Sequence, residues 1–164
     1  MIEKTFPILE KLLANGLKST QKLFELLNAE HEQLKAQKDP MAIDALASHK
    51  KEVVTQLEQF SKQLGQVLAT EKLLMSQDGI NHYFAKAKTT GINISDAFTC
   101  WSEISDLSKT CRSLNEQNGA SIDLLGRHAQ RALHVLRGKS QLNTTYGPDG
   151  STRSELFSHT LISV

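Results

Sequence analysis

The sequence predicts an all-α protein: an elongated antiparallel helical hairpin plus a long third helix, with coiled-coil-like packing and a flexible C-terminal tail. Three observations support this class. Apolar residues recur every three or four positions over most of the 164 residues, which is the spacing of amphipathic helices. Aromatic residues make up only 5% of the chain, while Leu, Ala, Gln, Lys and Glu are abundant. The only prolines, Pro7, Pro40 and Pro148, separate the predicted segments.

The first predicted helix covers about residues 3–38. Pro7 lies in its first turn, where the missing N–H costs nothing. Gly16 weakens the helix locally without ending it. The predicted buried stripe follows steps of three and four: Phe6, Leu9, Leu13, Leu17, Thr20, Phe24, Leu27, His31 and Leu34.

The second predicted helix covers about residues 40–76. Asp39 is expected to be its N-cap, and Pro40 takes the first helical position. The short Asp39-Pro40 connection favours antiparallel pairing with the first helix. The stripe of this helix consists of Ile43, Leu46, Lys50, Val53, Leu57, Phe60, Leu64, Val67, Glu71 and Leu74.

A connector over residues 77–95 is expected to hold a short helix around Tyr83, and Ser95-Asp96 is expected to cap a third long helix over about 96–137. That helix would be about 60 Å long, longer than an ordinary compact bundle, so we expect an elongated molecule. Its stripe is Trp101, Ile104, Ser108, Cys111, Asn115, Asn118, Ile122, Leu125, Ala129, Ala132 and Leu136.

Helical periodicity ends at Gly138, which suits a C-cap. We therefore predict one helical domain over residues 1–138 and an extended or mobile tail over 139–164.

Composition and charge exclude several classes of function. The formal net charge of +1 gives no bulk attraction to nucleic acid or to an anionic membrane. The N-terminal sequence lacks the basic start and apolar run of a signal peptide, and no uncharged apolar stretch has membrane-spanning length. Cys100 and Cys111 are about 16 Å apart along one helix, too far for a disulfide. We expect free thiols and a cytoplasmic protein.

No pattern in the sequence points to catalysis, a metal or a cofactor. The six histidines do not cluster, and Lys35 stands where the zinc-protease pattern starting at His31 needs a second histidine. Gly138-Lys139-Ser140 lacks the earlier glycine and the preceding strand of a phosphate-binding loop. We therefore expect a protein that is not an enzyme.

Asn115, Asn118 and Gly119 are unusual residues for the seam of a long helix. The two amides could form a polar layer that sets helix register, or the floor of a partner-binding groove. Gly119 could mark a close helix crossing, or a gap that admits another backbone. Trp101 is expected to anchor the core, with its indole N–H bonded to a polar partner.

The third helix is longer than either of the first two, so its last turns are expected to lack an internal partner. Apolar residues left uncovered there form a candidate groove for an amphipathic helix, and small residues would permit close approach. These residues are Ile122, Leu125, Ala129, Ala132, Leu133 and Leu136.

The tail carries the sequence Tyr146-Gly147-Pro148-Asp149-Gly150, which predicts a turn. A tyrosine presented by such a turn can be incidental or can serve as an aromatic docking anchor.

These features together resemble the FlgN family of flagellar type III export chaperones. The resemblance is concentrated in about residues 98–150, while the first ninety residues agree only in being long amphipathic helices. The matching residues are Trp101, Leu107, Leu114, Asn115, Asn118-Gly119, Ala132-Leu133, Leu136, Tyr146-Gly147 and Asp149-Gly150, with Ile162-Ser163-Val164 at the end.

The resemblance implies a cytoplasmic chaperone that binds the C-terminal helices of hook-associated proteins, prevents their premature assembly and delivers them to the type III export gate. It maps client binding onto the distal third helix, here Asn118, Gly119 and the apolar residues Ile122, Leu125, Ala129, Ala132, Leu133 and Leu136. It maps docking to the cytoplasmic domain of the export gate protein FlhA onto Tyr146, Gly147, Asp149 and Gly150.

An alternative is a self-associating coiled-coil structural or adaptor protein, in which the same stripes join copies of the chain. A homodimer is left open in either case. The preferred hook-associated protein is likewise left open.

Overall fold

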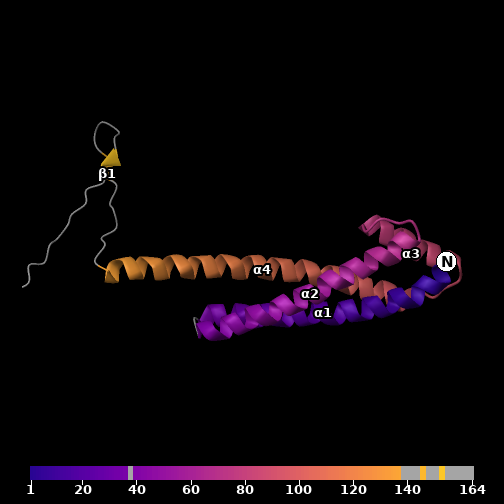
Figure 1. Cartoon of the computed structure of the whole chain (residues 1–164), viewed down its shortest axis with the longest axis horizontal. Helices are drawn as coiled ribbons and strands as arrows, with labels where there is room; N and C mark the ends of the chain where they lie inside the picture. Colours follow the sequence, from indigo (N-terminus) through magenta and orange to yellow (C-terminus); the bar gives the residue numbers. More distant parts are fainter. Residues whose placement is uncertain (37–38, 138–144, 147–151, 154–164) are drawn as a thin grey trace, which may run out of the picture. The chain divides into compact units, whose positions relative to one another are not determined.

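The computed structural model describes residues 1–36, 39–137, 145–146 and 152–153. Within these ranges the order of elements is α1 (Ile2–Ala36), α2 (Pro40–Thr70), α3 (Gln77–Thr89), α4 (Ser95–Leu136), β1 (Thr145–Tyr146) and β2 (Thr152–Arg153) (Figure 1). The two strands pair antiparallel, with Tyr146 opposite Thr152. The predicted all-α class, with a helical hairpin and a long further helix, is confirmed.

Contacts divide the chain into a first unit, Met1–Ser121, and a second unit, Ile122–Val164. The boundary falls inside α4, so one continuous helix belongs to both units. The division differs from the predicted domain boundary after residue 138, which stays a prediction.

α1 and α2 form the predicted antiparallel hairpin. Cross-helix hydrogen bonds join Thr5 to Glu71, Ser19 to Gln56 and Glu30 to Lys50, so the numbering rises along one helix and falls along the other. Asp39 caps α2 as predicted, its carboxylate accepting from the Met41 N–H at 2.9 Å. The hairpin's main apolar core consists of Ile2, Phe6, Leu9, Leu13, Leu64, Val67 and Leu68.

The second helix ends at Thr70 and not at residue 76 as predicted. Lys72 adopts a left-handed conformation (φ 60°), its N–H donates to the Ala69 carbonyl, and the Leu73 N–H donates to the Leu68 carbonyl. This is the hydrogen-bond pattern of a Schellman stop. A lysine occupies the position that usually holds a glycine, and the apolar spacing continues to Leu74. The sequence alone therefore does not indicate that the helix ends at Thr70.

The predicted short helix in the connector is present as α3, which is anchored to both hairpin helices. Ser76 caps it, accepting from the Gly79 N–H at 3.0 Å. The fully buried Tyr83 hydroxyl bonds Thr5 Oγ1 at 2.8 Å. Lys86 bonds and pairs with the buried Glu71 carboxylate at 2.6 Å, and this bond lowers the pKa of Glu71. A helix of 13 residues is thereby held in place.

Candidate functional site

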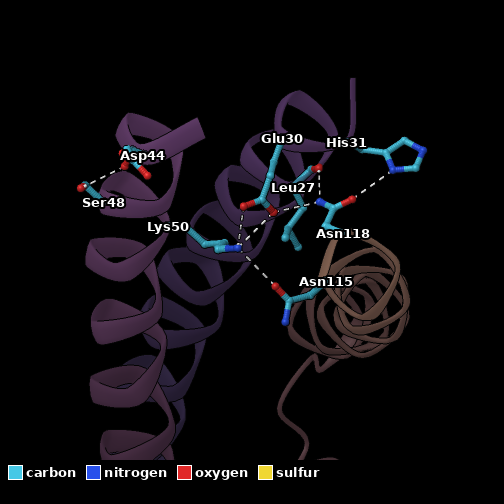
Figure 2. Close-up of polar contacts among 8 residues, drawn as sticks. All are labelled: Leu27, Glu30, His31, Asp44, Ser48, Lys50, Asn115 and Asn118. Atoms are coloured by element: carbon cyan, nitrogen blue, oxygen red, sulfur yellow. Dashed lines mark hydrogen bonds and ion pairs between the residues drawn. The ribbon is translucent and has the colours of Figure 1, made fainter. Parts of the chain in front are cut away.

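A polar layer joins the first part of α4 to the hairpin. The Asn118 amide donates to the Leu27 carbonyl and to the Glu30 carboxylate, both at 2.9 Å, and its oxygen bonds His31 Nδ1 at 3.0 Å (Figure 2). Lys50 from α2 pairs with Glu30 at 2.9 Å. Glu30 and Asn118 are each only 1% exposed. The buried carboxylate is therefore compensated by one cation and one amide.

Asn115 lies at the edge of this layer. Its side-chain oxygen accepts a 3.4 Å bond from Lys50, and the residue is exposed (Figure 2). The geometry favours the register-setting interpretation of both asparagines, because their amides connect α4 to α1 and α2.

The sequence predicted Asn118 to be a client-binding residue, but in the structure this residue is not on the surface. Its side chain is buried against α1 and its polar atoms are occupied by partners in the same chain. We therefore leave Asn118 out of the surface proposed below. Gly119 is exposed, and a Cβ built on it meets nothing within 4 Å. Within the described part of the chain, a close helix crossing is therefore not the reason for this glycine.

Cys111 and Trp101 complete the packing of the first part of α4. The Cys111 thiol is buried and lies 3.9 Å from the Thr20 carbonyl, and burial raises the pKa of this thiol. Trp101 packs against the main core as expected. Its indole N–H is buried and has no hydrogen-bond partner among the described residues, so the expected polar partner is not found there.

Beyond the polar layer, the apolar residues of α4 are exposed or half-buried. Ile122 is 43% exposed, Leu133 49% and Leu136 82%. Ala129 and Ala132 are exposed, and Leu125 is half-buried. We call these six residues the distal stripe: Ile122, Leu125, Ala129, Ala132, Leu133 and Leu136. They lie within the second unit, and helical spacing places them on one side of α4.

Two further exposed apolar residues escaped the sequence prediction. Leu124 is 51% exposed and Val135 is 72% exposed. They are three helical turns apart and lie on one side of α4, about a third of a turn around the helix from the centre of the distal stripe, since each residue turns the helix by about 100°. The prediction followed one seam only, and a count of apolar residues around the whole helix would have found them.

The predicted docking residues fall largely outside the described residues. The backbone of Tyr146 belongs to β1, whereas Gly147, Asp149 and Gly150 lie in the undescribed segment between β1 and β2.

In the part of the chain that the structure describes, no helix is long and apolar enough to cross a membrane. Within the same residues, no group of three or more His, Cys, Asp or Glu side chains is arranged to hold a metal ion.

Comparison with known proteins gives one clear match. The model of the family described as FlgN protein matches residues 1–154. The chain belongs to the FlgN family. FlgN proteins are flagellar export chaperones that bind hook-associated proteins. The match includes the first ninety residues, where the sequence alone showed only amphipathic helices. Searches of curated proteins and of solved structures gave no match.

Proposed function

We propose that this FlgN-family chaperone captures the C-terminal helical segment of a hook–filament junction protein on the distal stripe. The observation that supports the proposal is the exposure of Ile122, Leu133 and Leu136 on one side of a long helix. An amphipathic helix of the client would lie along this side and cover its own apolar residues there. While covered, those residues cannot take part in premature assembly.

The stripe suits binding that is specific but reversible. Covering a fully exposed leucine or isoleucine contributes about 1.5–3 kcal/mol, and these residues are already partly covered. Ordering of the client segment and of the side chains opposes binding. The net affinity is therefore expected to be moderate, as delivery of the client to the export gate requires.

Small residues permit close approach of the client helix. Ala129 and Ala132 lie between the larger residues of the stripe, and Gly119 and Gly126 leave open space above their backbones. A partner helix can therefore approach α4 closely along this side, which increases contact between the two backbones.

We propose that the C-terminal tail takes part in delivering the client to the export gate. By its resemblance to the family, Tyr146-Gly147 with Asp149-Gly150 would contact the cytoplasmic domain of the export gate protein FlhA, as an aromatic anchor beside a turn. The chaperone would then act in the cytoplasm, where the client is synthesised and the gate domain is reached.

The client site is tested with Leu133→Asp. A charge within the stripe should abolish binding of the client's C-terminal segment, measured by isothermal titration calorimetry, while helical content by circular dichroism is unchanged. Ala120→Asp places the same side chain on an exposed position off the stripe and should bind the client normally. Melting of the whole protein by Leu133→Asp would show that Leu133 belongs to the core.

The same variant separates the chaperone from a self-associating coiled coil. An oligomer that is independent of concentration, is lost in Leu133→Asp and ignores hook-associated proteins would overturn the proposal. Light scattering of the purified protein, with and without client segments, makes this measurement.

Docking is tested with Tyr146→Ala. Binding to the FlhA cytoplasmic domain should weaken by about tenfold or more, which is the usual cost of removing an aromatic anchor, and client binding should be unchanged. Equal loss of both activities would contradict separate client and gate sites.

A further inference from the structure

The apolar surface of distal α4 is wider than one partner helix covers. The distal stripe occupies about 100° of the helix circumference, since each residue turns the helix by about 100°. Leu124 and Val135 lie beyond the edge of the stripe that Ala132 forms, and they are 51% and 72% exposed. With these two residues, apolar side chains extend over an arc of about 180°, from Leu124 to Leu133.

Charged side chains occupy the other half of this segment. They are exposed, and helical spacing places them outside the apolar arc: Asp123, Arg127, Arg131, His134 and Arg137. Among residues 122–137, His128 is the only titratable side chain within the arc. The boundary between the two halves is therefore well defined on both sides of the helix.

An arc of this width is typical of a helix with two neighbours. A helix that pairs with one partner has apolar residues at two positions of each heptad, whereas a helix inside a bundle also has them at flanking positions. The seam of the distal stripe is flanked by Leu133 on one side and by Val135 on the other. Distal α4 thus presents two overlapping surfaces, each wide enough for one helix.

We call the second surface the lateral set: Leu124, His128, Arg131 and Val135. The steps between these residues are four, three and four, so they lie along one side of the helix. All four are exposed, and all belong to the second unit and to one continuous helix. The lateral set therefore depends only on the geometry of α4 itself.

The charge around the lateral set favours an acidic partner. Arg131 stands at its edge, and the His128 ring can donate a hydrogen bond to a carboxylate. Residues 122–137 contain three arginines and two histidines but only one acidic residue, Asp123, although the formal net charge of the whole chain is +1. A carboxylate on a partner would therefore meet cations here with little repulsion.

A protein helix fits this surface better than an anionic membrane does. Helices that lie in a membrane surface commonly carry Trp or Phe with Leu on their apolar face, and residues 122–137 contain no aromatic residue. Gly126, Ala129 and Ala132 give little apolar depth for insertion into lipid. These small residues do permit close approach of another helix.

We propose that distal α4 packs between two helices of one client: the first covers the distal stripe, and the second, which carries acidic residues beside its apolar ones, covers the lateral set. This inference rests on the proposed chaperone function, because the first helix brings the second to α4. Once the first is bound, the second binds intramolecularly, at an effective concentration of roughly millimolar for a short connection. A weak lateral contact then raises the total affinity.

Isothermal titration calorimetry of the full chain with two lengths of client tests the inference. The short probe is a synthetic peptide of the client's last helix, and the long probe is the C-terminal segment that contains its last two helices. The long probe should bind the unmodified chain about tenfold more tightly, or better. We call this difference the advantage of the long probe.

Val135→Asp should remove the advantage of the long probe and leave the affinity of the short probe unchanged. The new carboxylate would lie in the apolar part of the lateral contact, where its desolvation opposes binding. His134→Asp is the matched control, because it places the same carboxylate one residue away, on an exposed position outside the apolar arc. This control should keep the advantage.

Arg131→Glu tests the predicted charge of the second client helix. The reversal should reduce the advantage of the long probe by about fivefold, which is the scale of an exposed ion pair. Arg131→Lys keeps the charge and should keep most of the advantage. Added salt should reduce the advantage in the unmodified chain and have less effect in Arg131→Glu.

Several results would overturn the inference. One is equal affinity of the two probes for the unmodified chain, and another is an equal loss of both probes in Val135→Asp. Tighter binding of the long probe by Val135→Asp would show that part of this chain covers the lateral set and competes with the client. Phosphatidylglycerol vesicles that bind the unmodified chain but not Val135→Asp, with the advantage intact, would assign the surface to a membrane.

The short probe separates this inference from the proposed function. If the short probe binds and Leu133→Asp abolishes its binding, the chaperone site stands whatever the long probe does. If the short probe binds and the long probe has no advantage, only the two-helix arrangement fails. If neither probe binds, the proposed function fails, and the two-helix arrangement fails with it.

Discussion

The two parts of α4 carry the same apolar spacing and differ in what covers it. Ala97, Ile104, Cys111 and Asn118 follow one another at intervals of seven and are each at most 5% exposed. The next positions in this series are Leu125, which is half-buried, and Ala132, which is exposed. The spacing therefore shows which side of the helix is apolar, whereas the presence of a neighbouring helix determines whether that side is buried.

The lengths of the helices explain this difference. α1 ends at Ala36, nine residues after Leu27, while α4 continues 18 residues beyond Asn118, the partner of Leu27, to Leu136. α1 and α4 run in the same direction, because Thr20 and Leu27 pair with Cys111 and Asn118 in that order. α4 therefore extends beyond this contact for twice as many residues as α1 does.

The largest expected effect compares one leucine from each region. Leu27→Ala removes a side chain that is 1% exposed and should lower the free energy of unfolding by about 2–5 kcal/mol. Leu133→Ala, at 49% exposed, should change it by less than about 0.5 kcal/mol. Urea denaturation measures both. Equal losses would show that the second region is folded against a core like the first.

A smaller effect is expected in the polar layer. Asn118→Ala removes both hydrogen bonds that the amide donates and leaves Glu30 with Lys50 alone, at a cost of about 1–3 kcal/mol in the free energy of unfolding. Asn115→Ala removes one exposed bond and should cost less than about 0.5 kcal/mol. Chemical denaturation of the two variants compares them directly. If Asn118→Ala left the free energy of unfolding unchanged, the polar layer would not be what holds α4 to the hairpin.

The smallest expected effect compares two glycines. Gly126→Ala should raise the free energy of unfolding by up to about 1 kcal/mol, because alanine favours the helix and its Cβ meets nothing within 4 Å. Gly16→Ala should raise the free energy of unfolding by less than this, or lower it, because the added Cβ would lie 2.6 Å from the Phe60 ring. Thermal unfolding followed by circular dichroism checks both. A gain of the same size at Gly16 would show that α1 and α2 are not in close contact there.

Several features of the fold could be predicted from the sequence because they depend on neighbours along the chain. The Asp39-Pro40 start of α2 uses an N-cap and a proline, both of which act within one turn. The end of α2 could not be predicted, since Lys72 adopts a left-handed conformation without the glycine that usually marks one. Nor could the partners of Asn118, which come from residues 27–31 of another helix.

By itself, the sequence determined the helical class, the side of each helix that is apolar and, with its tyrosine-containing tail, the resemblance to FlgN proteins. These follow from spacing and local residue type. Only the tertiary structure decided that Asn118 is buried with Glu30 while Ile122, one turn later, is open. Burial depends on which helices lie alongside and where they end, and these are long-range properties that the periodicity of one helix does not contain.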